Sequence, residues 1–258
     1  DYQPKYCAIT FDLPYPTFRH EMFKEYKAHR PPTPQELINQ FDKIKEVLET
    51  LKIPIFEVKG YEGDDVLGTL SRQAEKQEVE CIILTGDTDT LQLVSPLVKV
   101  LLSHGSQKKT LYDEKKVEER YDGLGSQFIA EIKALQGDPS DNIPGIPSVG
   151  AKTAIKLLKE FGSIKGIYNN IAKIPTGKMR DSLIKNEELA YKCKTLTTIE
   201  REIPINLDLD KTIFWQFERK KIVEKLNSLE FSSLISRIPK MNNSIEKVLE
   251  ISDDTLIY

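Results

Sequence analysis

The chain has 258 residues, a formal net charge of −3 and only three cysteines. This length allows one large domain or two smaller ones, and no apolar run is long enough to span a bilayer. The cysteines, Cys7, Cys81 and Cys193, lack the spacing of a disulfide framework or a zinc site. We therefore expect a globular protein of a reducing cytoplasm. The negative charge alone speaks against a nucleic-acid partner, although bound cations would reverse the field of clustered acids.

Short apolar runs predict the strands, at Tyr6–Phe11, Ile53–Val58, Cys81–Leu84 and Val98–Leu102. Each run except the last is followed by a helical pattern, for example the apolar spacing of residues 37–51. Alternating strands and helices indicate βαβ units, and we expect an α/β fold with a parallel sheet flanked by helices.

Acidic residues gather at the boundaries of these expected elements. The four clusters comprise Asp12; Glu62, Asp64 and Asp65; Asp87 and Asp89; and Asp138 and Asp141. Open α/β sheets bind ligands at the carboxyl ends of their strands, and hard divalent cations such as Mg²⁺ take oxygen ligands. Any one cluster could instead cap a helix or a turn. Capping does not require the same boundary position each time, so we favour a metal site.

Basic and aromatic residues alternate in the segment after Asp12. Thr17 can cap a helix there, and Pro31 and Pro32 can end it. Its side chains include Arg19, Lys24, Lys27 and Arg30 with Phe18, Phe23 and Tyr26. This mixture suits a nucleic-acid strand, by phosphate pairing and base stacking. An amphipathic helix with a solvated basic face is the equally good alternative.

The pattern becomes helical from about Ser126. Gly145 and Gly150 bracket a tight connection between two helices, and Lys152 stands at the start of the second. Free backbone N–H groups at such a helix start can bind a phosphate. The sequence of residues 144–153 is typical of a helix-hairpin-helix element that binds duplex DNA without reading bases. A plain helical hairpin is the alternative. After two further helices, at Glu187–Ile199 and Phe217–Phe231, the chain turns polar at Pro239.

Five motifs in register make this chain similar to a known family. They are Phe11-Asp12 with residues 16–21, Tyr26-Lys27 with Arg30-Pro-Pro, Glu62-Gly-Asp-Asp, residues 85–89, and residues 137–145. From about Ala8 to Pro239 the sequence resembles the 5′ nuclease domain of bacterial DNA polymerase I and, more broadly, the flap endonuclease superfamily. The resemblance implies a PIN-like core in residues 1–125, a helix-hairpin-helix (helix-two-turn-helix) region in residues 126–239, and a linker or truncated tail in residues 240–258.

The resemblance also implies roles for named residues. Two Mg²⁺ or Mn²⁺ ions are expected on Asp12, Glu62, Asp64, Asp65, Asp87, Asp89, Asp138 and Asp141. Lys27 and Arg30 are expected to steer and polarise the scissile phosphate. DNA contacts are expected from Arg19, Tyr26, Gly145, Gly150, Lys152 and Thr153, with K⁺ as a further ion at the hairpin. The substrate implied is DNA with a 5′ flap, a nick or a duplex junction.

Two departures from the family pattern shape these expectations. The family's opening strand, with an Asp-Gly-Asn motif, does not precede Asp1, and no polymerase domain follows Pro239. We expect a piece of a longer polymerase-linked protein, monomeric, bacterial, cytoplasmic and nucleoid-associated, with impaired catalysis. The alternatives are a non-catalytic DNA-binding module and, less well supported by the hairpin, a metal-dependent ribonuclease. A small-molecule phosphatase would not need the basic, aromatic segment at Phe18–Arg30.

Overall fold

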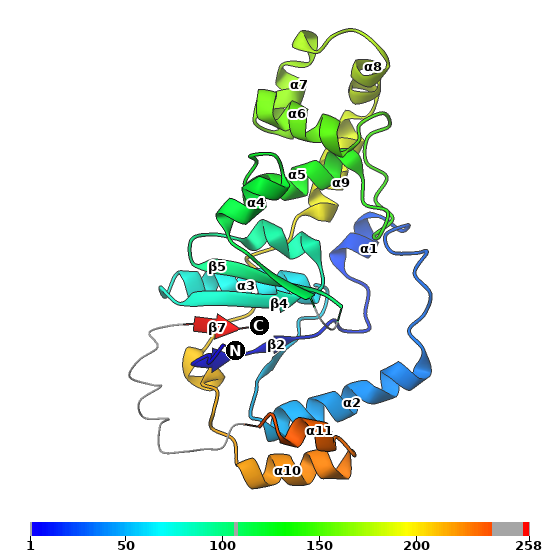
Figure 1. Ribbon diagram of the computed structural model, residues 1–258. Helices are drawn as coiled ribbons and strands as arrows, with labels where there is room; N and C mark the ends of the chain where they lie inside the picture. The colour runs from blue at the N-terminus through cyan, green and yellow to red at the C-terminus, as the bar shows by residue number, and fades with distance from the viewer. Residues whose placement is uncertain (1, 106–107, 239–254, 258) are drawn as a thin grey trace.

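A sheet lies in the middle of an elongated molecule, with a helical part above it and α2, α10 and α11 below it in Figure 1. The structure is a computed structural model, and it describes residues 2–105, 108–238 and 255–257. The sheet has five strands in the order β1 (Tyr6–Cys7), β7 (Thr255–Ile257), β4 (Glu80–Thr85), β5 (Val98–His104) and β6 (Lys108–Tyr112). The first four strands are parallel, as predicted, and β6 pairs antiparallel with β5.

The strand between β1 and β4 comes from the far end of the chain. Leu256 pairs with Tyr6 on one side and with Cys81 on the other. Residues 240–258 were expected to form a linker or truncated tail, and Thr255–Ile257 within that range form β7. The remainder of that segment lies outside the described residues.

The strand expected at Tyr6–Phe11 is divided between two sheets. β1 belongs to the five-stranded sheet, whereas β2 (Ile9–Thr10) pairs with β3 (Ile55–Phe56) in a separate parallel ladder. The chain therefore changes sheets at Ala8, which is fully buried. This crossing brings the end of β2, and with it Asp12, to the start of α3 (Gly63–Glu75).

The basic, aromatic segment forms only a short helix. α1 covers Phe18–Met22 and begins at Thr17 as predicted, where the Thr17 hydroxyl and the ring of His20 are 2.9 Å apart. It ends before Phe23, whose backbone is extended, and does not continue to Pro31. Turns follow, and α2 (Gln35–Thr50) begins after Pro34.

The other helices form two groups. The upper group contains α4 (Glu114–Arg120), α5 (Ile129–Gln136), α6 (Ala151–Phe161), α7 (Ile164–Asn169), α8 (Lys178–Lys185) and α9 (Glu187–Thr197). The lower group contains α2, α10 (Arg219–Ser228) and α11 (Ser232–Ile235). Short 3₁₀ turns lie at η1 (Thr88–Leu93), η2 (Ser126–Phe128), η3 (Ile171–Lys173) and η4 (Leu209–Thr212).

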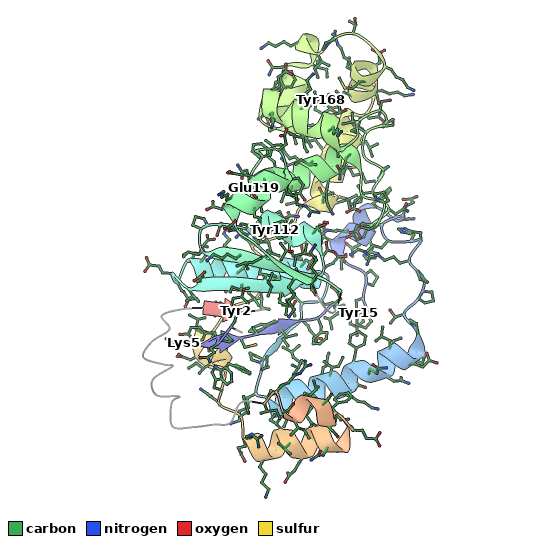
Figure 2. All side chains as sticks on the ribbon, viewed as in Figure 1. Tyr2, Lys5, Tyr15, Tyr112, Glu119 and Tyr168 are labelled. Atoms are coloured by element: carbon green, nitrogen blue, oxygen red, sulfur yellow. The ribbon has the colours of Figure 1, made fainter. Side chains whose placement is uncertain are left out.

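The upper helices and the sheet meet at α4. Figure 2 shows Tyr112 at this junction, where Arg120 Nη1 donates a hydrogen bond to the Tyr112 hydroxyl at 2.9 Å. Nothing in the described part of the chain is both helical and apolar over the length needed to cross a membrane.

Three apolar clusters among the described residues stabilise this arrangement. One lies around the sheet and α3, a second fills the upper helical group, and a third joins α2 to α10 through Phe217, Ile222 and Leu226. Ile203 and Leu207 belong to the first cluster, although both were expected in the second domain. The predicted division after residue 125 therefore does not separate the cores, because the chain returns to the sheet after α9.

The returning chain, residues 198–207, is held along α3 and is called the crossing segment below. Gln73 donates to the carbonyl of Ile205 at 2.8 Å and accepts from the backbone N–H of Leu207 at 2.6 Å. Gly68 faces the crossing segment so closely that a Cβ at this position would collide with it. The glycine therefore allows the two backbones to approach.

Candidate metal and DNA site

The start of α3 brings acids from separate strands together. Glu62 is the N-cap residue, and Asp64 lies in the first turn. Asp12, which follows β2, accepts a hydrogen bond from the Gly63 backbone N–H at 2.6 Å. A carboxylate is stabilised at this end of a helix by the free N–H groups and by the helix dipole.

Asp64 lies in the most crowded part of this acidic group. Burial, and then the charges of Asp87, Asp12 and Glu62, raise the pKa of Asp64 to about 7. Lys27 opposes this rise but does not cancel it. Such crowding of carboxylates favours the binding of a cation among them, because a cation stabilises every ionised form.

A second group of acids lies beside the first. Asp87 follows β4 and accepts a hydrogen bond from the Asp89 backbone N–H at 2.8 Å. Lys133 on α5 pairs with both Asp89 and Asp138, and its Nζ donates to Asp138 Oδ2 at 2.7 Å. Burial alone would raise the pKa of Asp138, but hydrogen bonds from Lys133 and Ser140 hold it below its ordinary value.

A third contact joins the turn after α1 to the loop after α5. Lys27 Nζ donates to Glu62 Oε1 at 2.7 Å, while the Lys27 backbone N–H donates to the carbonyl of Asp141 at 3.0 Å. Arg30 Nη2 donates to Asp141 Oδ1 at 2.6 Å. Lys27 adopts a positive φ of 54°, which costs a side-chain-bearing residue free energy. This strained backbone positions the ammonium group over the acids.

Seven of the eight acids expected as ligands are linked through these contacts. Asp65 is not, because other groups occupy both of its carboxylate oxygens, which is at odds with the ligand role expected for it. Its Oδ1 accepts from Arg19 Nη2 at 2.8 Å and from the Glu200 backbone at 2.9 Å. Its Oδ2 accepts from Arg19 Nη1 at 2.7 Å and from the Glu62 backbone at 3.0 Å. Asp65 is fully buried, so it is a structural acid that fixes the start of α3.

Arg19 also differs from its expected role. It is only 3% exposed, and besides Asp65 it donates to the carbonyls of Leu196 at 2.9 Å and Thr198 at 2.7 Å. Burial alone would lower the pKa of Arg19, but the hydrogen bond to Asp65 raises it. A guanidinium group engaged in this way joins α1, α3 and the end of α9, and has no exposed face for a DNA phosphate.

Tyr26 was expected to contact DNA, but its side chain is buried and bonded to two acids instead. Its side chain is 2% exposed, and its hydroxyl lies 3.1 Å from Glu62 Oε2 and 2.9 Å from Asp141 Oδ2. Burial, and then the charges of Glu62 and Asp141, raise the pKa of Tyr26 well above its ordinary value. The hydroxyl therefore holds two acids from distant parts of the chain at a fixed spacing.

The donor set fits a hard divalent cation in its chemistry. Every acid in the group offers carboxylate oxygens, which Mg²⁺ and Mn²⁺ prefer. As the side chains stand, no three Asp, Glu, His or Cys residues in the described part of the chain are arranged to hold one ion. Lys27, Arg30 and Lys133 pair with several of these acids instead. Side-chain rotation away from these cations would be needed for ligation.

The predicted hairpin lies at the start of α6. Gly145 has φ +64°, and a Cβ there would collide with the backbone of Gln136 and Gly137. Gly150 is the N-cap residue, and a Cβ on it would meet nothing within 4 Å. Lys152 and Thr153 line an open groove of about 340 Å³ beside this helix. The helix start is therefore accessible to a phosphate.

Sequence reasoning missed two members of the acidic site. Lys133 is the cation between Asp89 and Asp138, and Ser140 donates to Asp138 Oδ1 from its hydroxyl at 2.6 Å. Ser140 carried a signal, because it lies between two predicted ligands. Lys133 carried none, because a lysine on a helix is ordinarily solvated and only the fold directs it at the acids.

Comparisons with known proteins identify related sequences. The family model of the 5′-3′ exonuclease N-terminal resolvase-like domain matches residues 1–122. The model of the 5′-3′ exonuclease C-terminal SAM fold matches residues 124–222. DNA polymerase I of Chloroflexus aurantiacus is 42% identical over 248 residues, which is 93% of this chain and 26% of the relative. DNA polymerase I of Bacillus subtilis is 35% identical over 254 residues, 98% of this chain and 29% of the relative.

Solved structures share the fold. The T5 5′-exonuclease with bound divalent metal ions (zinc) has a TM-score of 0.61 at 20% identity, covering 96% of this chain and 84% of that one. The catalytic core of Rad2 in complex with DNA substrate has a TM-score of 0.60 at 15% identity, covering 90% and 80%. The chain spans less than a third of the curated relatives it matches. By its two consecutive domain matches, the chain belongs to the 5′-3′ exonuclease family.

Proposed function

We propose that this chain is a metal-dependent 5′-3′ nuclease that hydrolyses phosphodiester bonds at flaps, nicks or duplex junctions in DNA. The observation that carries the proposal is the meeting of Asp12, Glu62, Asp64 and Asp87 at one end of α3. These residues come from three separate segments, and crowding leaves Asp64 short of positive charge. Structural acids are ordinarily paired, as Asp65 is with Arg19. In this group Lys27 and Arg19 both pair with Glu62, so one carboxylate takes both of these ion pairs and a cation site better explains the crowding of the others.

Two divalent ions would supply an activated water and neutralise the charge on the reacting phosphate. We assign Asp12, Glu62, Asp64 and Asp87 to one position, and Asp89, Asp138 and Asp141 to the other. Mg²⁺ and Mn²⁺ are the proposed ions. The T5 relative is described with divalent metal ions, which supports the cation class and leaves the choice of ion to experiment.

Lys27 and Arg30 are the proposed phosphate contacts. Their charged groups lie at the margin of the acids, and Arg30 remains 49% exposed on its side chain. Each could exchange its carboxylate partner for a phosphate oxygen when DNA arrives. Arginine binds phosphate through a planar fork and lysine as a point charge. The two residues would orient the scissile phosphate and balance its developing charge.

The start of α6 is the proposed duplex contact. A Cβ on Gly150 would meet nothing within 4 Å, and Lys152 and Thr153 lie in the first turn that follows it. This suits a phosphate at a helix N-terminus, with K⁺ as a further ion proposed at the same turn. The Rad2 relative is described in complex with DNA substrate, which supports the substrate class.

We propose a bacterial, cytoplasmic setting and a link to a polymerase, because relatives named DNA polymerase I align over nearly all of this chain. Monomeric action on DNA is part of the same proposal. The proposed functional units are a nuclease core in residues 1–125 and a helical DNA-binding region from residue 126, with the return of the chain to the sheet described above.

The test uses the full chain and a labelled double-flap DNA. With Mg²⁺ or Mn²⁺ we expect release of the 5′ flap, and with EDTA we expect none. The same flap made of RNA distinguishes a ribonuclease. DNA binding without cleavage, in either metal at any concentration tried, would contradict the proposal and favour the non-catalytic DNA-binding module.

A further inference from the structure

The acids of the proposed site are not equally supplied with protein cations. Asp12, Glu62, Asp64 and Asp87 form a group in which Lys27 and Arg19 both pair with the same acid, Glu62, at 2.7 Å and 3.8 Å. Asp89 and Asp138, by contrast, already share the ammonium group of Lys133 between them. The three side chains in this second set are 13%, 16% and 8% exposed in the order Lys133, Asp89, Asp138.

Such a buried ammonium group has a strong effect on any second cation. Charges only a few ångströms apart repel strongly where water is partly excluded. A divalent ion binding Asp89 and Asp138 would have to move Lys133 away, and the lysine would lose both of its carboxylate partners. The lysine stem has four carbons and several rotatable bonds, so its head can swing away without movement of α5.

We propose that Lys133 is a resident counter-cation of the Asp89–Asp138 pair, which a divalent ion displaces when it binds there. Lys133 thereby weakens metal binding at this position relative to the Asp12–Glu62–Asp64–Asp87 position. The site would then fill in order as the metal concentration rises. This inference rests on the proposed function for the identity of the ligands, but not on cleavage itself.

The experiment measures Mn²⁺ binding to the full chain without DNA, by electron paramagnetic resonance of the free ion. Lys133→Met removes the charge and keeps the length of the side chain. We expect the weaker class of Mn²⁺ sites to tighten about tenfold, with the tighter class unchanged. Lys133→Arg is the matched control, because it keeps the positive charge, and its weaker class should not tighten.

Equal or weaker Mn²⁺ binding by a folded Lys133→Met variant would overturn the proposal. A second measurement needs no charge removal. In the wild-type protein, the side-chain Nζ resonance of Lys133, assigned by its loss in Lys133→Arg, should shift on addition of Mg²⁺ in the same concentration range as the weaker sites. A resonance that stays fixed through saturation would also overturn it.

These outcomes are separable from failure of the nuclease activity. Tighter Mn²⁺ binding by Lys133→Met in a chain that never cleaves DNA would support the counter-cation role of Lys133 and contradict the proposed nuclease activity. Normal cleavage with unchanged metal affinity would do the reverse.

Discussion

The acidic site and the start of α6 are the two surfaces proposed to meet DNA, and they are built in opposite ways. Around the acids, buried contacts such as Arg19 with Asp65 and Tyr26 with Glu62 fix the backbone and several side chains. At the start of α6, Gly150 has open space in front of it, and Lys152 is exposed.

The difference follows from what each surface would bind. Metal ions need several ligands at set distances, so their surroundings must be rigid. A DNA backbone needs positive charge and access, and tolerates movement of the side chains. Substitutions should therefore act on stability and cleavage at the first surface, and on affinity and salt dependence at the second.

The largest effect is expected from Asp64→Asn. It removes one charge from the crowded group with almost no change of shape. Loss of a residue that only hydrogen-bonds a metal ligand lowers metal affinity or activity by up to roughly 100-fold, and loss of a ligand itself should have a larger effect. We expect cleavage to fall by more than about 100-fold, with DNA binding retained. Single-turnover flap cleavage measures the first and a gel-shift titration the second. Asp210→Asn, an exposed acid, is the control; an Asp64→Asn rate near wild type would remove Asp64 from the ligands.

Next in size is the loss of the buried ion pair in Arg19→Met. The change leaves Asp65 charged and buried without its partner, which destabilises proteins by about 3–5 kcal/mol. Urea denaturation measures the free energy of unfolding. Arg72→Met is the control, because its partner Glu202 is 70% exposed, and we expect a change below about 1 kcal/mol. Similar losses for both variants would contradict the assignment of Arg19 to the structure.

The two glycines of the hairpin sharpen the contrast further. Gly145→Ala places a Cβ against the Gln136–Gly137 backbone at a positive φ, and should destabilise the protein by about 2 kcal/mol. Gly150→Ala meets open space, so its stability should stay within about 0.5 kcal/mol of wild type while duplex affinity falls. Thermal unfolding with a duplex-binding titration compares them; equal destabilisation by both would place Gly150 in the packed structure.

The smallest effect is expected from Lys152→Ala. Loss of one phosphate contact should weaken duplex affinity a few-fold and reduce the slope of log K against log salt by about 0.9. Binding measured by fluorescence anisotropy at several salt concentrations gives the slope. Lys220→Ala on α10, where the side chain is 88% exposed, should leave the slope unchanged. An unaltered slope for Lys152→Ala would show that no phosphate sits there.

Local sequence pattern predicted much of this molecule. The parts that it did not predict depend on contacts between distant segments. The helix start at Thr17, the strand at β4 and the turn from Gly145 to Gly150 follow from capping, periodicity and glycine placement. The structural role of Asp65 could not be predicted, because Asp65 lies one residue from Asp64 in the same helical turn. Helix geometry turns successive side chains about 100° apart, so one faces the acids and the other faces Arg19.

The same reason explains the errors at Arg19 and Tyr26. Composition marks a basic, aromatic segment but cannot say which members are buried. Tyr26 faces Asp141, more than a hundred positions away in the sequence. Lys133 on α5 faces Asp89 in η1, which is a separate element. Such partners are set by how the sheet and the upper helices pack, which no local pattern encodes.

The crossing segment has a consequence for how this protein can be divided. In chain order the crossing segment comes after the whole upper helical group, yet its backbone lies along α3. Ile203 and Leu207 complete the apolar core around the sheet. The junction near residue 123, where two recognisable sequence modules abut, is therefore not a place to cut. An isolated amino-terminal half would expose to water the apolar residues of α3 that pack in the same core as Ile203 and Leu207, so we expect it to aggregate.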